Sequence, residues 1–272
     1  MDTETVQVAI SDGIASVLFN RPKKKNAMNP QLHEDITRVL EWLRYEDAAR
    51  VIVISGAGDA FCAGMDLKEF FHDLKDKPKE YNRILRLATE WRSRTLRYYP
   101  KPTIAMVNGF CFGGAFSIVE SCDLAFAAKE AKFGLSEINF KGFPGGSVSK
   151  SLANLFRPRD ALFYAMTGRT FDGAEAERIG FVNKAFALAD LQAETMKIAG
   201  EIASKDPVAL QMTKDAYRHS LDMPLDAALN FSVAKEAEMT MQQGDAWRRE
   251  GIGDFVAGQY KPGLGANQKD RR

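Results

Sequence analysis

Two segments rich in small residues could each place a backbone N–H group at a reaction centre. Residues 55–69 follow the apolar run 51–54 and lead into a stretch that can start a helix at Met65. Residues 108–117 follow the apolar run 102–107 in the same way. The first N–H groups of a helix have no intrahelical partners, and two such donors directed at one oxygen stabilise negative charge that develops there. Glycine-rich turns are common after strands, so it is the pair of segments that indicates a site.

Proton transfer at such a site requires an acid–base side chain, and Glu137 is the candidate. It lies in the segment Leu-Ser-Glu-Ile-Asn, close to the apolar residues Phe133 and Ile138. Apolar surroundings desolvate a carboxylate and raise its pKa towards values that suit catalysis. Because most glutamates are exposed, this assignment depends on the family motif described below.

Cysteine and histidine residues offer weaker candidates. Cys62 and Cys111 lie inside the two glycine-rich segments, but no histidine nearby in the sequence could act as their base. Small buried cysteines are common, so we interpret both as structural. His33, His72 and His219 are isolated and lack the spacing of a triad or a metal site, so we expect no metal.

The composition argues against several classes of protein. The 272 residues are 45% hydrophobic and 27% charged, as in a globular protein with one large domain and an appendage. A net charge of +1 argues against a nucleic-acid partner. We find no targeting signal at the start and no apolar run long enough to span a membrane. Three cysteines without metal-like spacing favour reduced thiols and a cytoplasmic location.

The elements that position these segments alternate between strands and helices. Alternating apolar runs at 6–10 and 14–19 predict a hairpin, and Asn29 as N-cap before Pro30 predicts a helix over 30–47. Further strands are predicted at 51–54, 103–107, 123–127, 132–134 and 182–186. Further helices are predicted at 66–98 (interrupted at 71–80), 113–121, 160–168 and 174–180. This alternation predicts an α/β fold.

The pattern changes to helices alone after residue 187. Helices are predicted at 188–204, 207–220 and 224–243. Such a run buries its apolar face poorly, so we expect it to pack on another subunit or over the active site. The predicted organisation is a core over 1–187, a C-terminal helical oligomerisation or lid region over 188–264, and a mobile tail over 265–272.

Several motifs together resemble those of the enoyl-CoA hydratase/isomerase family, the crotonase superfamily. The matching segments are 20–28 (Asn-Arg-Pro-Lys-Lys-Lys-Asn-Ala-Met), 63–68, 101–109, 113–115, 122–125 and 133–139. They are ordered and spaced as in that family and extend over nearly the whole chain. A narrower likeness, to hydroxycinnamoyl-CoA (feruloyl-CoA) hydratase-lyases, rests on the segments around Met65, Gly114 and Glu137.

The resemblance implies a crotonase-type superhelix of ββα units with a C-terminal helical region. It also implies homotrimers, which often pair into hexamers, and a CoA thioester as substrate without a prosthetic group. By the resemblance, the backbone N–H groups of Met65 and Gly114 form the oxyanion hole, and Glu137 and Ser117 are the catalytic side chains. The implied CoA-binding residues are Lys24, Ala27, Ala63, Asp66, Leu67 and Lys68. The implied acyl-pocket residues are Phe70, Trp91, Phe143 and Val233.

Two departures from the family pattern bear on the reaction. Ordinary enoyl-CoA hydratases use two glutamates, but Ser117 occupies the position of one of them, and Glu120 lies nearly one helical turn further on. Hydratase-lyases share this combination of glutamate and serine. They also place two tyrosines around the substrate phenol, at positions that match Phe70 and Val233 here. Tyr81, Tyr98, Tyr99 or Ser232 are the candidates to replace those hydroxyl groups.

These residues leave several functions open. The leading prediction is a hydratase-lyase that converts a hydroxycinnamoyl-type CoA thioester to an aromatic aldehyde and acetyl-CoA. The alternatives are hydration of a non-phenolic or aliphatic enoyl-CoA without cleavage, enoyl-CoA isomerisation, and a non-catalytic CoA- or RNA-binding relative. Lys141 adds a further question, because an ammonium group facing Glu137 would lower the pKa of that carboxyl.

Overall fold

The structure is a computed structural model that describes residues 3–259. The chain forms two compact units, one up to Ala203 and one from Ser204. The predicted tail over 265–272 lies outside the described residues. The described helices include none that is both long and apolar enough to cross a membrane.

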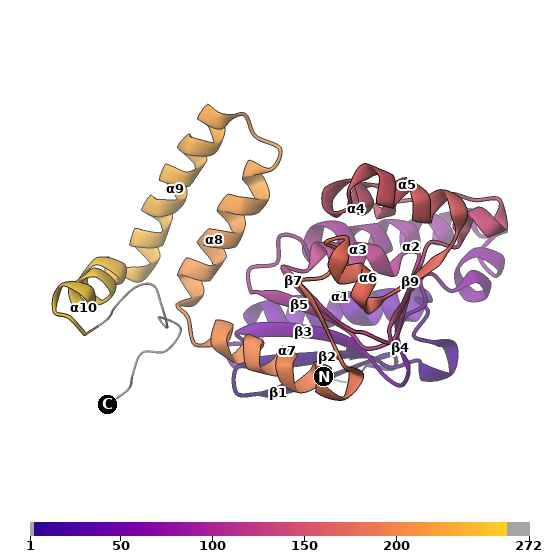
Figure 1. The fold of residues 1–272 in the computed structure, drawn as a ribbon, viewed down its shortest axis with the longest axis horizontal. Coiled ribbons are helices and arrows are strands. Elements are labelled where there is room, and N and C mark those ends of the chain that lie inside the picture. The colour runs from indigo at the N-terminus through magenta and orange to yellow at the C-terminus, as the bar shows by residue number, and fades with distance from the viewer. Residues whose placement is uncertain (1–2, 260–272) are drawn as a thin grey trace. The chain divides into compact units, whose positions relative to one another are not determined.

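A six-stranded sheet forms the base of the first unit (Figure 1). Its strands, in spatial order, are β1 (Val6–Ser11), β2 (Ile14–Phe19), β3 (Val51–Gly56), β5 (Thr103–Val107), β7 (Leu124–Ala128) and β10 (Lys184–Phe186). β1 and β2 form the predicted antiparallel hairpin, and the other neighbours are parallel. The hairpin turn places Asp12 and Gly13 at φ angles of 52° and 78°, the left-handed region that such two-residue turns require.

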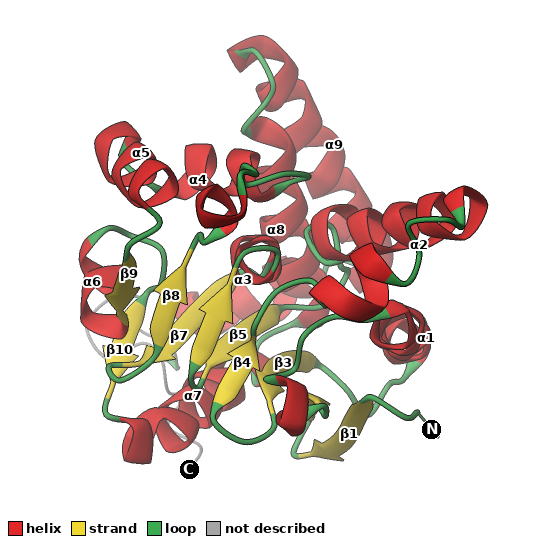
Figure 2. Cartoon of the chain, turned by 90° about the vertical axis from the view of Figure 1, so that its right-hand side faces the viewer, coloured by secondary structure: helices red, strands yellow, loops and turns green. Residues whose placement is uncertain are grey.

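A second, smaller sheet lies beside the first and was not predicted as a sheet (Figure 2). Its strands, in spatial order, are β4 (Ala60–Cys62), β6 (Phe110–Phe112), β8 (Lys132–Gly134) and β9 (Thr170–Asp172). β4 follows β3, β6 follows β5, and β8 follows β7, each before a helical segment. This repetition of two strands and a helix confirms the predicted crotonase-type ββα architecture.

The helices mostly begin and end near the predicted boundaries. Those of the first unit are α1 (Pro30–Tyr45), α2 (Pro78–Glu90), α3 (Ala115–Ser121), α4 (Val148–Leu155), α5 (Pro158–Thr167), α6 (Gly173–Arg178) and α7 (Leu188–Ala203). Asn29 caps α1 as expected, because its side chain accepts a hydrogen bond of 2.9 Å from the Leu32 N–H. Helix α4 was not predicted.

The helical stretch predicted over 66–98 is interrupted at residues 73–77, inside the break predicted over 71–80. A first wide, π-helical turn, η2 (Leu67–His72), ends before Pro78, which begins α2. A second wide turn, η3 (Trp91–Thr95), continues directly from α2. In it the Leu96 N–H donates to Trp91 O, five residues back, at 3.0 Å. Wide turns of this kind are rare and often occur at functional sites.

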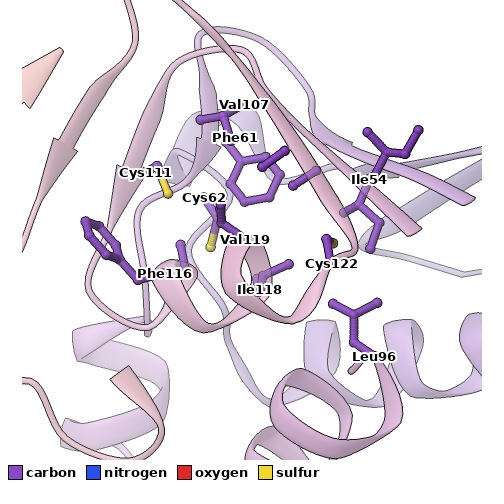
Figure 3. Packing of buried hydrophobic residues seen from close by; sticks show 14 of the residues in the cluster. Ile54, Phe61, Cys62, Leu96, Val107, Cys111, Phe116, Ile118, Val119 and Cys122 are labelled. Atoms are coloured by element: carbon purple, nitrogen blue, oxygen red, sulfur yellow. The ribbon is translucent and has the colours of Figure 1, made fainter. Parts of the chain in front are cut away.

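The core of the first unit is continuous between the two sheets and the helices. Figure 3 shows side chains from β3, β4, β5, β6 and α3 packed together, among them Phe61, Cys62, Cys111 and Phe116. All three cysteines are buried as free thiols. Burial raises the pKa of Cys62 to about 12 and also raises that of Cys111, so neither forms the thiolate that a nucleophile requires.

Helix α7 packs on strands of the large sheet and so belongs to the first unit. The structural division therefore falls after Ala203 rather than at the predicted boundary after residue 187. The second unit contains α8 (Pro207–Ser220), α9 (Leu225–Gln243), the wide turn η5 (Trp247–Ile252) and α10 (Gly253–Val256). α8 and α9 pack on each other, and Lys235 of α9 donates to Asp215 of α8 at 3.0 Å.

Candidate active site

Three neighbouring strands of the small sheet end beside the two glycine-rich segments and the segment that carries Glu137. β4 leads to Met65, β6 leads to Gly113 and Gly114, and β8 leads to the short 3₁₀ turn η4 (Glu137–Phe140). β6 pairs in parallel with both β4 and β8. The carboxyl ends of the three strands therefore meet at one edge of the sheet, where ligands of α/β proteins commonly bind.

The two glycine-rich turns contact each other directly. Gly64 has a φ angle of 88°, and a Cβ atom there would lie 2.8 Å from Phe112 O and 3.5 Å from Gly114 N. A side chain at position 64 would therefore push the turns apart. Glycine at this position brings the backbone of one turn against the N–H group of the other.

The backbone of Met65 forms an isolated parallel β-bridge with Met28, and this bridge orients the Met65 N–H group. The Met28 N–H donates to Gly64 O at 2.7 Å, and Met28 O accepts from the Asp66 N–H at 2.9 Å. In this parallel bridge Met65 directs its own N–H away from Met28. Within residues 3–259 neither the Met65 N–H nor the Gly114 N–H has a hydrogen-bond acceptor.

The Glu137 carboxylate lies over the second turn. A Cβ atom on Gly113 would be 2.9 Å from Glu137 Oε1, and the Gly113 N–H donates to Gly134 O at 3.0 Å. Glu137 Oε2 is buried and has no hydrogen-bond partner in the described part of the chain. Burial raises the pKa of Glu137, while a hydrogen bond from its own backbone N–H acts more weakly in the opposite direction.

Lys141 does not oppose this effect. Its side chain is exposed, and it is not among the groups that alter the pKa of Glu137. The carboxylate therefore keeps the raised pKa that proton transfer near neutral pH requires.

Ser117 is buried in α3 at the end of a chain of hydroxyl groups. Ser93 Oγ donates to Ser147 Oγ at 2.6 Å, and Ser147 Oγ donates to Ser117 Oγ at 2.8 Å. The Ser117 oxygen thus accepts one hydrogen bond. Its own proton remains to be donated elsewhere.

Comparison with known proteins identifies the family. The model of the enoyl-CoA hydratase/isomerase family matches residues 9–259.

The chain belongs to the enoyl-CoA hydratase/isomerase family.

Relatives of this family member confirm the resemblance and the fold class. This chain is 42% identical, over 98% of its length, to a hydroxycinnamoyl-CoA hydratase-lyase from Pseudomonas fluorescens. The match covers 97% of that protein. The chain is 31% identical over 90% of its length to a short-chain-enoyl-CoA hydratase from Clostridium acetobutylicum, of which it covers 94%. A crystal structure of an enoyl-CoA hydratase subunit from Geobacillus kaustophilus superposes with a TM-score of 0.85 at 30% identity, covering 97% of this chain and 100% of that one. The chain is therefore an enzyme of this family.

The residues predicted to bind CoA lie around the Met65 turn. Lys24 and Lys68 are exposed, and Lys68 forms an ion pair of 3.5 Å with Asp73. The Ala63 N–H donates to Lys25 O at 2.9 Å, and Ala27 O accepts from Arg21. Leu67 is largely exposed.

Asp66 supports the turn through its side chain. Its carboxylate accepts from the Lys68 and Glu69 N–H groups at 3.1 and 2.9 Å and pairs with Arg21 at 3.0 Å. Burial raises the pKa of Asp66, but the hydrogen bonds from Glu69 and Arg21 outweigh it and hold that pKa below its usual value. Asp66 therefore remains ionised and fixes the residue that follows Met65.

The predicted acyl-pocket residues lie on different elements. Phe70 and Trp91 are both fully buried around His33: the Trp91 Nε1–H donates to His33 Nδ1 at 2.9 Å, and the Phe70 ring lies 6.0 Å from the imidazole. Phe143 is 75% exposed in the loop after η4. Val233 lies on α9, in the second unit, and is exposed within that unit.

A cavity of about 670 Å³ lies elsewhere, against the large sheet. Its walls come from β1, β2, β3, β5 and α7, and none of the predicted site residues contributes to it. The lining includes Gln7, Gln192 and Met196 but no acid or base. Because proton transfer needs a titratable side chain, we place the chemistry at the edge of the small sheet instead.

Glu120 is not a spare catalytic carboxylate. It is buried, and both of its oxygens accept from Arg97 Nη2, while Asn154 donates to it at 2.9 Å. Glu120 lies nearly one helical turn beyond Ser117, as its sequence position indicated, and the ion pair with Arg97 gives it a structural role.

Replacing Arg97 with Met is expected to lower the free energy of unfolding by about 3 kcal/mol, because Glu120 would be left as a buried charge without its cation. Chemical denaturation measures the change. Arg94→Met is the matched control, because the Arg94 side chain is exposed and only 3.6 Å from the exposed Glu90. Equal stability of the two variants would contradict the structural role of the Arg97–Glu120 pair.

Three residues near the site were not predicted from the sequence: Arg92, Ser93 and Ser147. Arg92 is 6% exposed, although arginine is rarely buried without a carboxylate. All three side chains reach the α3 N-terminus or Ser117 from outside the glycine-rich motifs. No motif or spacing in the sequence indicates these contacts.

Proposed function

We propose that this family member is a CoA-thioester lyase that hydrates a hydroxycinnamoyl-type enoyl-CoA and then cleaves the product to an aromatic aldehyde and acetyl-CoA. The observation that carries the proposal is the position of the Glu137 carboxylate over Gly113, next to the Gly114 N–H. The 42% identity to a hydroxycinnamoyl-CoA hydratase-lyase supports the substrate class.

In the proposed hydration, Glu137 removes a proton from water and the oxygen adds to the β-carbon. The electron pair of the double bond moves onto the thioester oxygen, which becomes an enolate. The Met65 and Gly114 N–H groups donate to that oxygen as an oxyanion hole. Glu137 then returns its proton to the α-carbon, so one carboxylate acts as base and acid in turn. Ser117 supports the water or the thioester through its remaining proton.

In the proposed cleavage, Glu137 removes the proton of the new β-hydroxyl group. The bond between the α- and β-carbons breaks, the β-carbon leaves as an aldehyde, and the electron pair forms the enolate of acetyl-CoA in the same oxyanion hole. Protonation of that enolate by Glu137 releases acetyl-CoA. The two stages therefore use the same groups and need no second acid.

The proposed CoA contacts are the exposed surface around the Met65 turn. Lys24 and Lys68 offer cations to the phosphates, and Ala27, Ala63, Asp66 and Leu67 line the approach to the turn. CoA enters as part of the substrate, and no prosthetic group is proposed.

The second unit supports the proposed assembly into homotrimers or hexamers. Its exposed apolar side chains include Leu221, Leu225, Leu229 and Met241. Surfaces of this kind commonly become buried between subunits. The buried free thiols are consistent with the proposed cytoplasmic location.

The phenol site is the point on which the substrate proposal depends. Phe70 has no hydroxyl group, and the Tyr99 hydroxyl is already used, since it donates to Leu40 O at 2.6 Å. Tyr81 packs on Phe70 with ring centroids 5.3 Å apart and is partly exposed. We propose that Tyr81 provides the hydroxyl partner for the phenol. The apolar Phe70 itself favours the alternative, hydration of a non-phenolic enoyl-CoA.

The purified protein should be assayed with 4-coumaroyl-CoA, feruloyl-CoA and crotonyl-CoA in parallel, with products identified by mass spectrometry. Aromatic aldehyde and acetyl-CoA are expected from the first two. A 3-hydroxyacyl product from crotonyl-CoA, with no aldehyde from the others, would instead establish the alternative function.

Tyr81→Phe is expected to reduce kcat/KM for 4-coumaroyl-CoA by about tenfold, because the substrate phenol would lose a hydrogen bond. The same variant should act on cinnamoyl-CoA, which has no phenol, as well as the unchanged protein does. Tyr45→Phe serves as the control, because Tyr45 is 74% exposed at the end of α1. Equal losses for both substrates would mean that Tyr81 has no role in recognising the phenol.

A further inference from the structure

The wide turn η3 directs Arg92 into the protein, directly behind the two donor turns. The side chain comes from η3, which packs on α3. A Cβ atom on Gly114 would lie 2.5 Å from Arg92 Nη1, 3.2 Å from Met28 Cε and 3.5 Å from Met65 Cγ. Arg92, Met28 and Met65 therefore surround the Cα atom of Gly114, the residue whose N–H is one of the proposed oxyanion donors.

Arg92 makes hydrogen bonds only with backbone carbonyls in the described part of the chain. Its Nη1 donates to Gly114 O at 3.0 Å, and its Nε donates to Ala88 O at 2.8 Å. No carboxylate among residues 3–259 forms an ion pair with it. Such a buried charge is costly, so it is expected to persist where the charge has a function.

The guanidinium group keeps its charge at neutral pH. Burial lowers the pKa of Arg92 to about 10, which still leaves it protonated. Its titratable neighbours do not neutralise it. Burial, aided by the charge of Arg92, lowers the pKa of His33 well below its usual value, and burial raises that of Cys62 to about 12, so both stay neutral. The cation is therefore uncompensated in a region of low dielectric, where its field is strong.

We infer that Arg92 is a positioning residue for the enolate: it holds the carbonyl of Gly114, the residue whose N–H is the donor, and adds positive charge behind the thioester oxygen. This inference rests on the proposed function, because that function supplies the enolate. Arg92 acts through Gly114 and through its field rather than by touching the substrate. Its charge favours the enolate over the neutral thioester, so it should contribute mainly to kcat.

Acetoacetyl-CoA provides a direct probe, because this β-ketoacyl thioester ionises to an enolate that absorbs in the near ultraviolet. Bound acetoacetyl-CoA should be titrated with pH on the unchanged protein and on Arg92→Met, Arg92→Gln and Arg92→Lys. Met and Gln remove the charge, and Gln keeps a donor for Gly114 O. Arg94→Met is the matched control, since Arg94 belongs to the same wide turn but is exposed.

The charge-removing variants are expected to raise the apparent pKa of the bound probe so that about tenfold less enolate is present at a fixed pH. Their kcat should fall by about tenfold or more, with KM changing much less. Arg92→Lys should recover most of the enolate, and Arg94→Met should behave like the unchanged protein. The acid limb of the kcat/KM profile should stay in place, because Arg92 is not among the groups that alter the pKa of Glu137.

The possible results separate this inference from the proposed function. If the unchanged protein binds and ionises acetoacetyl-CoA, and a folded Arg92→Gln or Arg92→Met variant does so equally well, the inference is wrong and the proposed function stands. A joint shift of the acid limb and the enolate titration would indicate a general distortion and would also overturn it. If the unchanged protein does not bind or ionise the probe, the proposed function and the inference fail together.

Discussion

Glu137→Gln is expected to lower kcat by about a thousandfold or more, because a single carboxylate moves the proton in every step of the proposed reaction. The amide has nearly the same shape but can neither accept nor return that proton. The dissociation constant of a CoA thioester should change only a few-fold, since the Met65 and Gly114 turns do not depend on the carboxylate charge. Steady-state kinetics measure kcat, and titration with an unreactive CoA thioester measures the dissociation constant.

The same substitution should stabilise the protein at neutral pH. Burial raises the pKa of Glu137 in the folded state, so the folded protein holds this proton more tightly than the unfolded chain does. Folding stability is therefore lost as pH rises from the unfolded pKa through the folded pKa, and the ionised carboxylate is a cost above that range. A Gln at this position removes the cost, and chemical denaturation at pH 7 should show a larger free energy of unfolding.

Opposite changes in activity and stability distinguish a catalytic carboxylate from a structural one. In the unchanged protein, activity should fall as pH is lowered through the raised pKa of Glu137, because the base becomes protonated. Glu90→Gln, at an exposed position, is the control and should change neither quantity. A Glu137→Gln variant that retains full activity would remove Glu137 from the mechanism.

The second large effect is expected from Gly113→Ala, which should reduce kcat by about a hundredfold. The new methyl group would lie 2.9 Å from Glu137 Oε1, closer than carbon and oxygen normally approach. The carboxylate must therefore move away from the donor turn. Misplacement of a reacting group by about 1 Å is enough for a loss of this size.

Gly146→Ala is a matched control for the backbone strain. Gly113 and Gly146 have similar φ angles, 50° and 59°, but a Cβ atom on Gly146 would have no neighbour within 4 Å. Both variants should lose about 1 kcal/mol of stability, because alanine is strained in this conformation. Only Gly113→Ala should lose most of its activity. Similar kinetic losses in the two variants would contradict the position of Glu137 over Gly113.

The large sheet and most helices could be predicted because their signals are local. Asn29 and Pro30 mark the start of α1. The pair Asp12-Gly13 between two alternating apolar runs is a strong signal for a two-residue hairpin turn. Of the small sheet only the strand at 132–134 was predicted, because strands of three residues are too short to show a period. Helix α7 was predicted as a helix, but its packing on the large sheet was not, since periodicity does not say which surface a helix covers.

The candidate site was predictable only as far as its motifs extend. The segments around Met65, Gly114 and Glu137 carry strong family signals, and the structure brings their backbones together through β4, β6 and β8. Arg92 has no such signal, because its burial results from the unusual winding of η3.

Because η3 continues from α2 as a wide turn, the number of residues in this helical segment decides which side chains face α3, as much as the residue types do. Each residue of an α-helix advances the side-chain direction by about 100°, so a turn that accommodates one extra residue changes which side chain faces α3. Loss of a single residue between Glu90 and Leu96 would restore regular winding and turn Arg92 away from Gly114. In the evolution of this family, a one-residue insertion or deletion here would change the polarity behind the thioester in one step, while the segments that carry Met65, Gly114 and Glu137 stayed the same.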